Sequence, residues 1–493
     1  MHNDIIKNEE TQEKSKRQKS KEAKQGLLST FLDSCNLWQN EQGEPFCDIR
    51  FGKETRSLAF KSSFLRAWIT HVIYEQEHMV PEKEIVNGIH DLLEAKARLY
   101  GTRYSTFTRV CRRKNELFVD LGQNKMVRID QNGWNVEVRE GIKFIESGNM
   151  LPQVLPARGG SISLLRKYLN VSDDDFKTLV FWIVGSYASQ DSQAILILNG
   201  PMDSGKSTTT EVIRSLIDPA PRPTDSPPKD EGDIAALAKN NFVLALDNLT
   251  FIPPWLSDTL CRISTGGGIG KARKLYTDNE SASFKAIRPV ILNGIPQFVE
   301  KSDLMSRCLL VPLQSVDVSK RAEWFHNITN VFPQEKNLIL GAIFDILVHA
   351  LRNEADSSMK DMPRLISFSK CCIGSEEALG WKGEFERLWN ANSVLKSDEF
   401  IATNQLAQAI FSYFEDCREH NKALVLRGKL TEIKAQLIMV AATELPKSDK
   451  DFANKLMALR NDLLKRGIYM PPKPGRTKHG TLYELTVMEK DKL

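Results

Sequence analysis

The sequence predicts an α/β protein with a parallel sheet at its centre, and three patterns lead to this prediction. Between about residues 162 and 315, short apolar runs alternate with loops and helix-forming segments, as in parallel strands joined by helices. Before this block, residues 103–146 alternate apolar and polar positions between turn signals, which indicates a small β meander. After it, helical patterns continue to about residue 420. We therefore expect an α/β core flanked by an α+β region and a mainly helical region.

We expect six segments in the 493 residues. The first segment, 1–26, is poor in apolar side chains and rich in lysine, which predicts disorder. The third segment, 151–161, is rich in proline and glycine, which predicts a linker. Within the second segment, 27–150, the spacing of apolar residues from about 27 to 98 favours helices ahead of the meander. The segments are a disordered basic tail (1–26), an N-terminal accessory α+β domain (27–150), a linker (151–161), the core (162–315), a helical lid and connecting region (316–420), and a winged-helix-like domain (421–493).

Composition places the chain among ordinary globular proteins. Apolar residues make up 41% and charged residues 26%, and a net charge of +4 is too small to indicate nucleic-acid binding by itself. The eight cysteines show no Cys-x-x-Cys pair and no zinc-ligand spacing, so we expect buried thiols in a reducing compartment. The longest apolar stretch, 338–351, is too short to span a bilayer. These features favour a cytoplasmic protein with no membrane partner.

The stretch "LILNGPMDSGKSTTTEV" indicates a phosphate-binding loop. An apolar strand precedes the loop and helix formers follow it, so successive backbone N–H groups and a helix N-terminus would surround phosphate oxygens. Lys206 is expected at the β- and γ-phosphates and Ser207 at Mg²⁺, which predicts ATP and Mg²⁺ as cofactors of a P-loop NTPase. Asp203 must point outward to avoid repelling the ligand. The expected nucleotide contacts are Gly200, Pro201, Met202, Asp203, Ser204, Gly205, Lys206, Ser207 and Thr208.

Polar residues end the following apolar strands. Asp247 closes the run "NNFVLALDN" and is a candidate to hold hydrated Mg²⁺, while Asn248 stands where many such ATPases carry a glutamate that activates water. Asn293 ends "AIRPVILNG" and is a candidate to orient that water. Arg307 precedes a fourth strand and is a candidate arginine finger for a neighbouring subunit. Each of these residues alone is also compatible with a strand-end cap or a surface charge.

The ordered segments "GPMDSGKST", "LALDN", "ISTGGGIGKARKLYTD", "RPVILNG" and "DLMSRCLLVPL" together resemble the superfamily 3 helicases of the AAA+ class, in particular the primase-helicase ATPases of phages, plasmids and integrated mobile elements. The resemblance implies that 263–278 forms a hairpin that grips single-stranded DNA in the channel of a hexamer. Its three cations, named here the hairpin cations, are Lys271, Arg273 and Lys274. The similarity of "MPRLISF" to the lid segment implies a γ-phosphate contact for Arg364. Residues 27–150 show no primase constellation.

The C-terminal segment 451–487 resembles a winged helix. Between Lys455 and Lys478 there are seven Lys or Arg residues and one Asp, and apolar residues at helical spacing would pack the helix. A capping helix and hairpin with a solvated basic face explains the same pattern equally well. The candidate DNA contacts are Lys455, Arg460 and Lys465 on the helix and Arg476 and Lys478 on the wing.

The favoured function is an ATP-dependent DNA translocase or helicase that acts as a homo-oligomeric ring, with a hexamer favoured, on single-stranded or forked DNA. Such an enzyme would serve replication of a phage, prophage or other mobile element. A small-molecule kinase is an alternative that needs an acceptor pocket and no second subunit. A nucleotide-gated DNA-binding switch, or an antiphage defence ATPase without unwinding activity, is a second alternative, because Asn248 suits slow hydrolysis.

Overall fold

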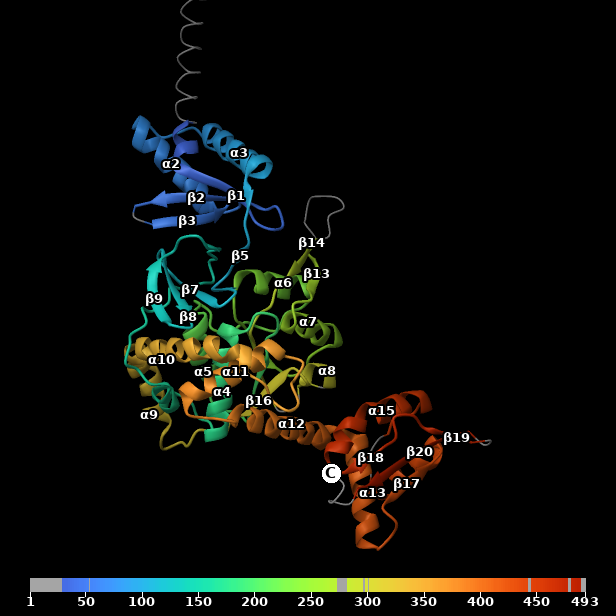
Figure 1. The fold of residues 1–493 in the computed structure, drawn as a ribbon. Helices are drawn as coiled ribbons and strands as arrows, with labels where there is room; N and C mark the ends of the chain where they lie inside the picture. Colours follow the sequence, from blue (N-terminus) through green and yellow to red (C-terminus); the bar gives the residue numbers. More distant parts are fainter. Residues whose placement is uncertain are drawn as a thin grey trace, which may run out of the picture.

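The computed structural model describes residues 29–52, 54–272, 282–295, 298–299, 301–441, 445–477 and 480–488. Along the chain, Figure 1 shows an N-terminal unit, a β meander, the α/β core and a C-terminal unit joined to the core by a long helix. The expected tail 1–26 lies outside the described residues. No helix in the described ranges has both the length and the apolar character needed to cross a membrane.

The core is a four-stranded parallel sheet in the order β12-β15-β11-β16. Its strands are β11 (Ile195–Asn199), β12 (Leu244–Leu249), β15 (Val290–Gly294) and β16 (Cys308–Pro312). They are short, nearly continuous apolar runs because both faces of the sheet are covered. The structure thereby confirms a mixed α/β protein with a parallel sheet.

Helices cover the two faces of the sheet, and each helical layer packs against alternate residues of the strands. Leu196 and Leu198 of β11 pack with the first helical layer, and Ile195 and Ile197 pack with the second. The first layer contains η1 (Ile162–Tyr168), α4 (Asp173–Ala188), α5 (Lys206–Ile217), α10 (Phe332–Asn353) and α11 (Ile366–Leu379). The second contains α6 (Glu231–Asn240), α7 (Pro254–Ser264) and α8 (Ser302–Met305). Between β16 and α11 the chain also forms α9 (Arg321–His326), η2 (Asn327–Val331) and η3 (Glu354–Asp356).

The β meander shares the core of the first helical layer. Its inward residues, including Leu117 and Trp134, belong to the same apolar cluster as α4 and α10. A buried ion pair also joins the two parts, since Arg109 Nε lies 3.0 Å from Asp218 Oδ1 and each side chain is 1% exposed. The meander strands are β6 (Val110–Arg113), β7 (Glu116–Gly122), β8 (Lys125–Asp130) and β9 (Gly133–Val138), and beside them β5 (Thr106–Phe107) pairs with β10 (Lys143–Phe144).

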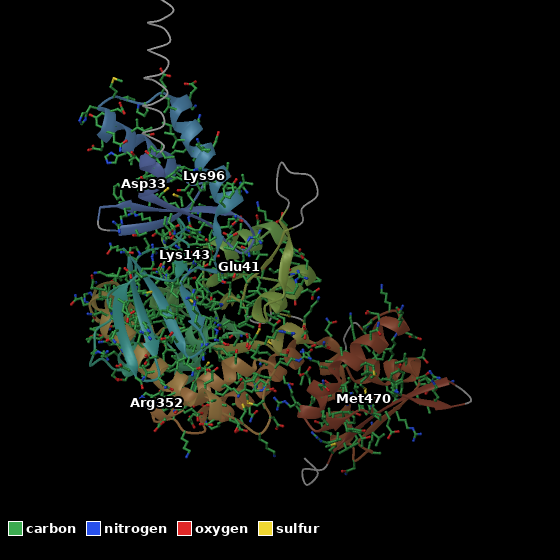
Figure 2. The ribbon with its side chains drawn as sticks, turned by 45° about the horizontal axis from the view of Figure 1, so that its top comes forward. Asp33, Glu41, Lys96, Lys143, Arg352 and Met470 are labelled. Carbon is green, nitrogen blue, oxygen red and sulfur yellow. The ribbon has the colours of Figure 1, made fainter. Side chains whose placement is uncertain are left out.

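The N-terminal unit has a core of its own and corrects the expectation of helices from 27 to 98. Helices α2 (Ser63–Glu77) and α3 (Lys83–Tyr100) confirm the helical spacing of that part, but three strands precede them. Those strands lack a visible period of two because both of their faces are covered: Cys47 packs on the helices, while Asp48 on the other face pairs with Lys143. Figure 2 shows Lys143 between the N-terminal unit and the β meander. The strands are β1 (Cys35–Gln39), β2 (Pro45–Phe51) and β3 (Glu54–Ala59), joined by β4 (Thr102–Arg103). Residues 27–150 therefore contain two units and not one.

The C-terminal unit has the order helix, strand, helix, helix and hairpin. Its apolar cluster includes Leu406 and Phe414 of α13, so the unit begins near residue 405 and not at 421. The sequence hides this boundary because α12 and α13 follow each other directly, with Asn404 as the N-cap of α13. The connecting helix is α12 (Glu384–Thr403), and the elements of the unit are α13 (Gln405–Glu419), β17 (Val425–Gly428), α14 (Leu430–Val440), α15 (Asp449–Lys465), β18 (Ile468–Tyr469), β19 (Gly475–Thr477) and β20 (Gly480–Val487).

Candidate nucleotide site

The loop between β11 and α5 needs its two glycines for close packing. A Cβ added at Gly200 would lie 2.5 Å from the backbone oxygen of Leu313. Gly205 is the N-cap of α5 with φ +79°, and a Cβ there would lie 2.5 Å from Cη2 of Trp324. Between the glycines, Ser204 is buried, whereas the Met202 side chain is 89% exposed. The glycine spacing is therefore a steric requirement of this strand-to-helix turn.

The acidic residue of the loop points away from it. Asp203 has φ +62°, a left-handed conformation that Asp adopts more readily than most residues. Its carboxylate lies 3.5 Å from Nη2 of Arg321, and its side chain is 67% exposed. Pro201 is exposed beside it, and Thr208 is half-buried in the first turn of α5. The outward direction expected for Asp203 is thus the observed one, with Arg321 as a partner that the sequence pattern did not indicate.

Lys206 folds back over the loop. Its Nζ donates to the backbone oxygens of Gly200 at 2.8 Å and Pro201 at 2.7 Å. Burial lowers the pKa of Lys206, and the negative charge of Asp247 opposes this shift. The ammonium group is therefore held at the mouth of the loop, close to the N-terminus of α5, where two positive features favour an anion.

Four side chains form one polar network at the carboxyl end of the sheet. The Ser207 hydroxyl donates to Asp247 Oδ2 at 2.8 Å, and Asn293 Nδ2 donates to Asp247 Oδ1 at 3.2 Å. Thr210, on the next turn of α5, donates to Asn293 Oδ1 at 2.9 Å. Thr210 and Asn293 are fully buried, so both ends of the amide are fixed. Asn293 therefore positions Asp247, in addition to any contact with water.

The oxygens of Ser207 and Asp247 fit Mg²⁺. This cation prefers oxygen ligands, keeps several water molecules and usually takes one or two protein carboxylates together with substrate phosphates. A hydroxyl and a carboxylate 2.8 Å apart beside the phosphate loop supply such a set. Among the described residues there is no group of three or more His, Cys, Asp or Glu side chains that would bind a metal without a substrate.

Asn248 adjoins Asp247, and the charge of Asp247 acts on Glu211. Asn248 is exposed with φ +59°, and its backbone N–H donates to Asp247 Oδ1 at 2.8 Å. Glu211 was not among the sequence candidates. Burial, and the charge of Asp247 as a smaller cause, raise the pKa of the Glu211 carboxyl. The signal that would have found it is spacing, because Glu211 lies one helical turn after Ser207 and so shares its face of α5.

Arg307 lies at the opposite end of the strands. Its backbone oxygen accepts from Ile195 N at 3.0 Å, beside the first residue of β11, whereas the phosphate loop follows the last. The five steps from Ile195 to Gly200 span about 16 Å, which is more than an arginine side chain reaches. The guanidinium is 13% exposed and lies 2.7 Å from the Asp303 carboxylate. Within one chain, Arg307 is therefore remote from its own phosphate loop.

Arg364, for which a γ-phosphate contact from the lid is expected, lies beside Arg307 within its own chain. Its Nη1 lies 3.1 Å from Asp303 Oδ1, so it shares the carboxylate that holds Arg307. The two arginines keep the pKa of Asp303 below its ordinary value, and Arg307 has the larger effect. The segment before α11 thus brings Arg364 to Asp303 of α8, next to Arg307 at the far end of the sheet.

The segment 263–278, expected to grip DNA as a hairpin, contains the end of α7 and the first strand of an antiparallel pair, and the second strand follows the segment. Strands β13 (Gly268–Ala272) and β14 (Ala282–Lys285) pair antiparallel and extend beyond α6 and α7 in Figure 1. Lys271 belongs to β13, whereas Arg273 and Lys274 lie outside the described residues.

The C-terminal cations are arranged unevenly. On α15, Lys455 and Lys465 are more than 40% exposed and lie 3.3 and 3.6 Å from aspartates of the same helix. Arg460 instead donates to the backbone oxygen of Met470 at 3.2 Å, which ties α15 to the start of the wing. Arg476 lines a shallow cavity between β17 and the wing, and Lys478 lies outside the described residues. Arg460 is thus partly engaged in the fold.

Comparisons with known proteins give one family match. Residues 162–384, less than half of the chain, match the family described as actinomycete integrative conjugative element replication protein. No curated protein sequence matches the chain. Two solved structures of the NrS-1 C-terminal region in an apo A form each cover 94% of this chain and 98% of their own, with 12% and 14% identity and TM-scores of 0.43 and 0.41. A structure of JCV helicase covers 48% of this chain and 63% of its own, with 13% identity and a TM-score of 0.24. The part of the chain that carries the loop, the strand-end network and both arginines is thus similar to a replication protein of a mobile element.

Proposed function

We propose that the protein is an ATP-dependent DNA translocase or helicase that works as a ring of identical subunits in replication of a mobile genetic element. The network of Ser207, Asp247, Asn293 and Thr210 beside the glycine loop carries the nucleotide part of this proposal. ATP with Mg²⁺ supplies the cleavable phosphoanhydride. Lys206 and the loop N–H groups hold the phosphates, and Ser207 and Asp247 hold the cation.

The position of Arg307 supports assembly. A transferring phosphoryl group needs a second cation, and about 16 Å separate Arg307 from its own loop. A neighbouring copy that docks the far end of its sheet against this loop would bring its Arg307 to the γ-phosphate. Such a head-to-tail contact repeats from copy to copy and closes into a ring. Asp303 would hold the arginine ready for this contact, and Arg364 would enter the same interface.

The polymer is proposed to be DNA. The match to a replication protein favours a nucleic acid, and the β13–β14 hairpin with its three cations fits contacts to a phosphate backbone without base readout. The exposed lysines of α15 add a second basic surface. The resemblance to superfamily 3 helicases agrees with both features.

A DNA-binding switch with slow hydrolysis is the second candidate. It is favoured by Asn248, which leaves no carboxylate directly after Asp247, and in this case nucleotide binding alone would change the affinity for DNA.

The test is ATP turnover by the purified protein over a hundredfold range of protein concentration, with and without single-stranded DNA. Lys206→Ala is the blank and Arg128→Ala, an exposed arginine of the meander, is the matched control. A ring-forming motor gives turnover per subunit that rises with concentration and with DNA. Turnover that is slow and indifferent to both contradicts the motor, and DNA affinity that changes with ATP would then support the switch.

A further inference from the structure

The side chain of Trp324 covers the phosphate loop from a distant part of the sequence. Trp324 lies in α9, after the last strand of the sheet, and its ring contacts Gly205 so closely that any side chain at Gly205 would collide with it. The chain around it is also fixed to the loop, because Val316 N donates to the Asp203 oxygen at 3.3 Å and Arg321 pairs with the Asp203 carboxylate. The tryptophan is therefore part of the loop's surroundings and not a remote surface residue.

Its indole N–H is buried without a partner. Trp324 Nε1 has no acceptor among the described residues and is shielded from solvent, although the residue as a whole is only half-buried. A buried donor without an acceptor is destabilising, and tryptophan N–H groups usually find an acceptor. Directly after α9 the backbone forms the five-residue π-helix η2, a rare form that is frequent at functional sites. These features point to a ligand that completes the contact.

The strand order indicates which part of a bound nucleotide would lie against Trp324. Asp247 and Asn293 come from β12 and β15, on one side of β11, so the metal and the γ-phosphate belong on that side of the loop. Trp324 comes from the chain after β16, on the other side of β11. A phosphate chain along the loop therefore places its nucleoside end toward Trp324.

We infer that Trp324 is one wall of the nucleobase site, where its ring stacks on the base and its Nε1–H donates to the nucleoside. This inference rests on the proposed nucleotide site and adds the recognition of its nucleoside half. Stacking on an aromatic side chain tolerates any base, because every base presents a π face.

The test compares ADP with inorganic triphosphate, which has phosphates and no nucleoside, by titration calorimetry on the full chain. Trp324→Ala is expected to weaken ADP binding roughly 5-fold to 150-fold and to leave triphosphate binding within twofold of wild type. Trp324→Phe keeps a ring and loses the N–H, so its loss is expected to be smaller. Trp255→Phe, which changes a half-buried tryptophan on the other helical layer, is the matched control and should bind both ligands as wild type does.

Four results would overturn the inference. If Trp324→Ala binds ADP as tightly as wild type does, Trp324 is not part of a nucleobase site. If the variant binds ADP more tightly, the ring of Trp324 blocks the loop. If the variant binds ADP and triphosphate equally more weakly, Trp324 only supports the structure of the loop. Wild-type protein that binds neither ligand would contradict the proposed function as well, whereas Trp324-dependent ADP binding without DNA-stimulated turnover would contradict the motor and leave the nucleobase wall standing.

Discussion

Replacing Asn293 with alanine removes the centre of the strand-end network. Two hydrogen bonds are lost, one of them to the charged Asp247, and the side chain is fully buried. A buried bond to a charged group contributes about 1.5–3 kcal/mol and a neutral one about 1 kcal/mol, so the variant should lose about 2.5–4 kcal/mol of unfolding free energy. The part that orients Asp247, about 1.5–3 kcal/mol, corresponds to a roughly 10-fold to 150-fold slower turnover.

The assay is kcat for ATP at saturating Mg²⁺, together with the Mg²⁺ concentration that gives half the maximal rate. Asn293→Ala should lower kcat and raise the Mg²⁺ concentration that gives half the maximal rate. Asn240→Ala is the control, because Asn240 is exposed and its amide bonds only to the helix backbone at Ala236. Turnover and Mg²⁺ dependence within twofold of wild type would refute the idea that Asn293 positions Asp247.

Three further predictions concern the hairpin, the buried ion pair and a buried lysine. Replacing all three hairpin cations with alanine should abolish stimulation by single-stranded DNA and keep basal turnover; unchanged stimulation would show that the hairpin does not contact DNA. Arg109→Ala should lower the free energy of unfolding in urea by about 3–5 kcal/mol, since it leaves the buried Asp218 carboxylate without its partner. A loss below about 1 kcal/mol would contradict this docking of the meander. Burial lowers the pKa of Lys396 from 10.5 to about 8. The unfolded chain therefore binds more protons between these values, stability should rise with pH from about 8 to 10.5 by at most about 3 kcal/mol, and Lys396→Met should remove that rise.

The sequence predicts the parts of the site that depend on local pattern. The glycine loop, Ser207 and the strand-end residues Asp247 and Asn293 were all found this way, because strands buried on both faces are continuous apolar runs and parallel strands end at one edge of the sheet. The structure brings these residues together within hydrogen-bond distance. Their roles with ATP and Mg²⁺ stay predictions.

The missed features depend on packing between distant segments. Trp324 reaches Gly205 across more than a hundred residues, and no periodicity marks it. The pairing of Arg364 with Asp303 beside Arg307 was also missed, because Asp303 belongs to α8 and is distant from Arg364 in sequence. Strands β1 to β3 were missed for a related reason, since Cys47 and Asp48 are both buried, on opposite faces, which erases the alternation that marks a strand.

In the proposed ring, one copy of the chain supplies the loop and another supplies Arg307. Mixing two inactive variants tests it most directly. Arg307→Ala keeps its loop and Lys206→Ala keeps its arginine, so in mixed assemblies one loop in two is intact and one neighbour in two carries Arg307. Each variant alone should be nearly silent, and their equal mixture should recover about a quarter of wild-type turnover, if the sites act independently. A mixture that co-assembles and stays silent, or Arg307→Ala that is active alone, would contradict it.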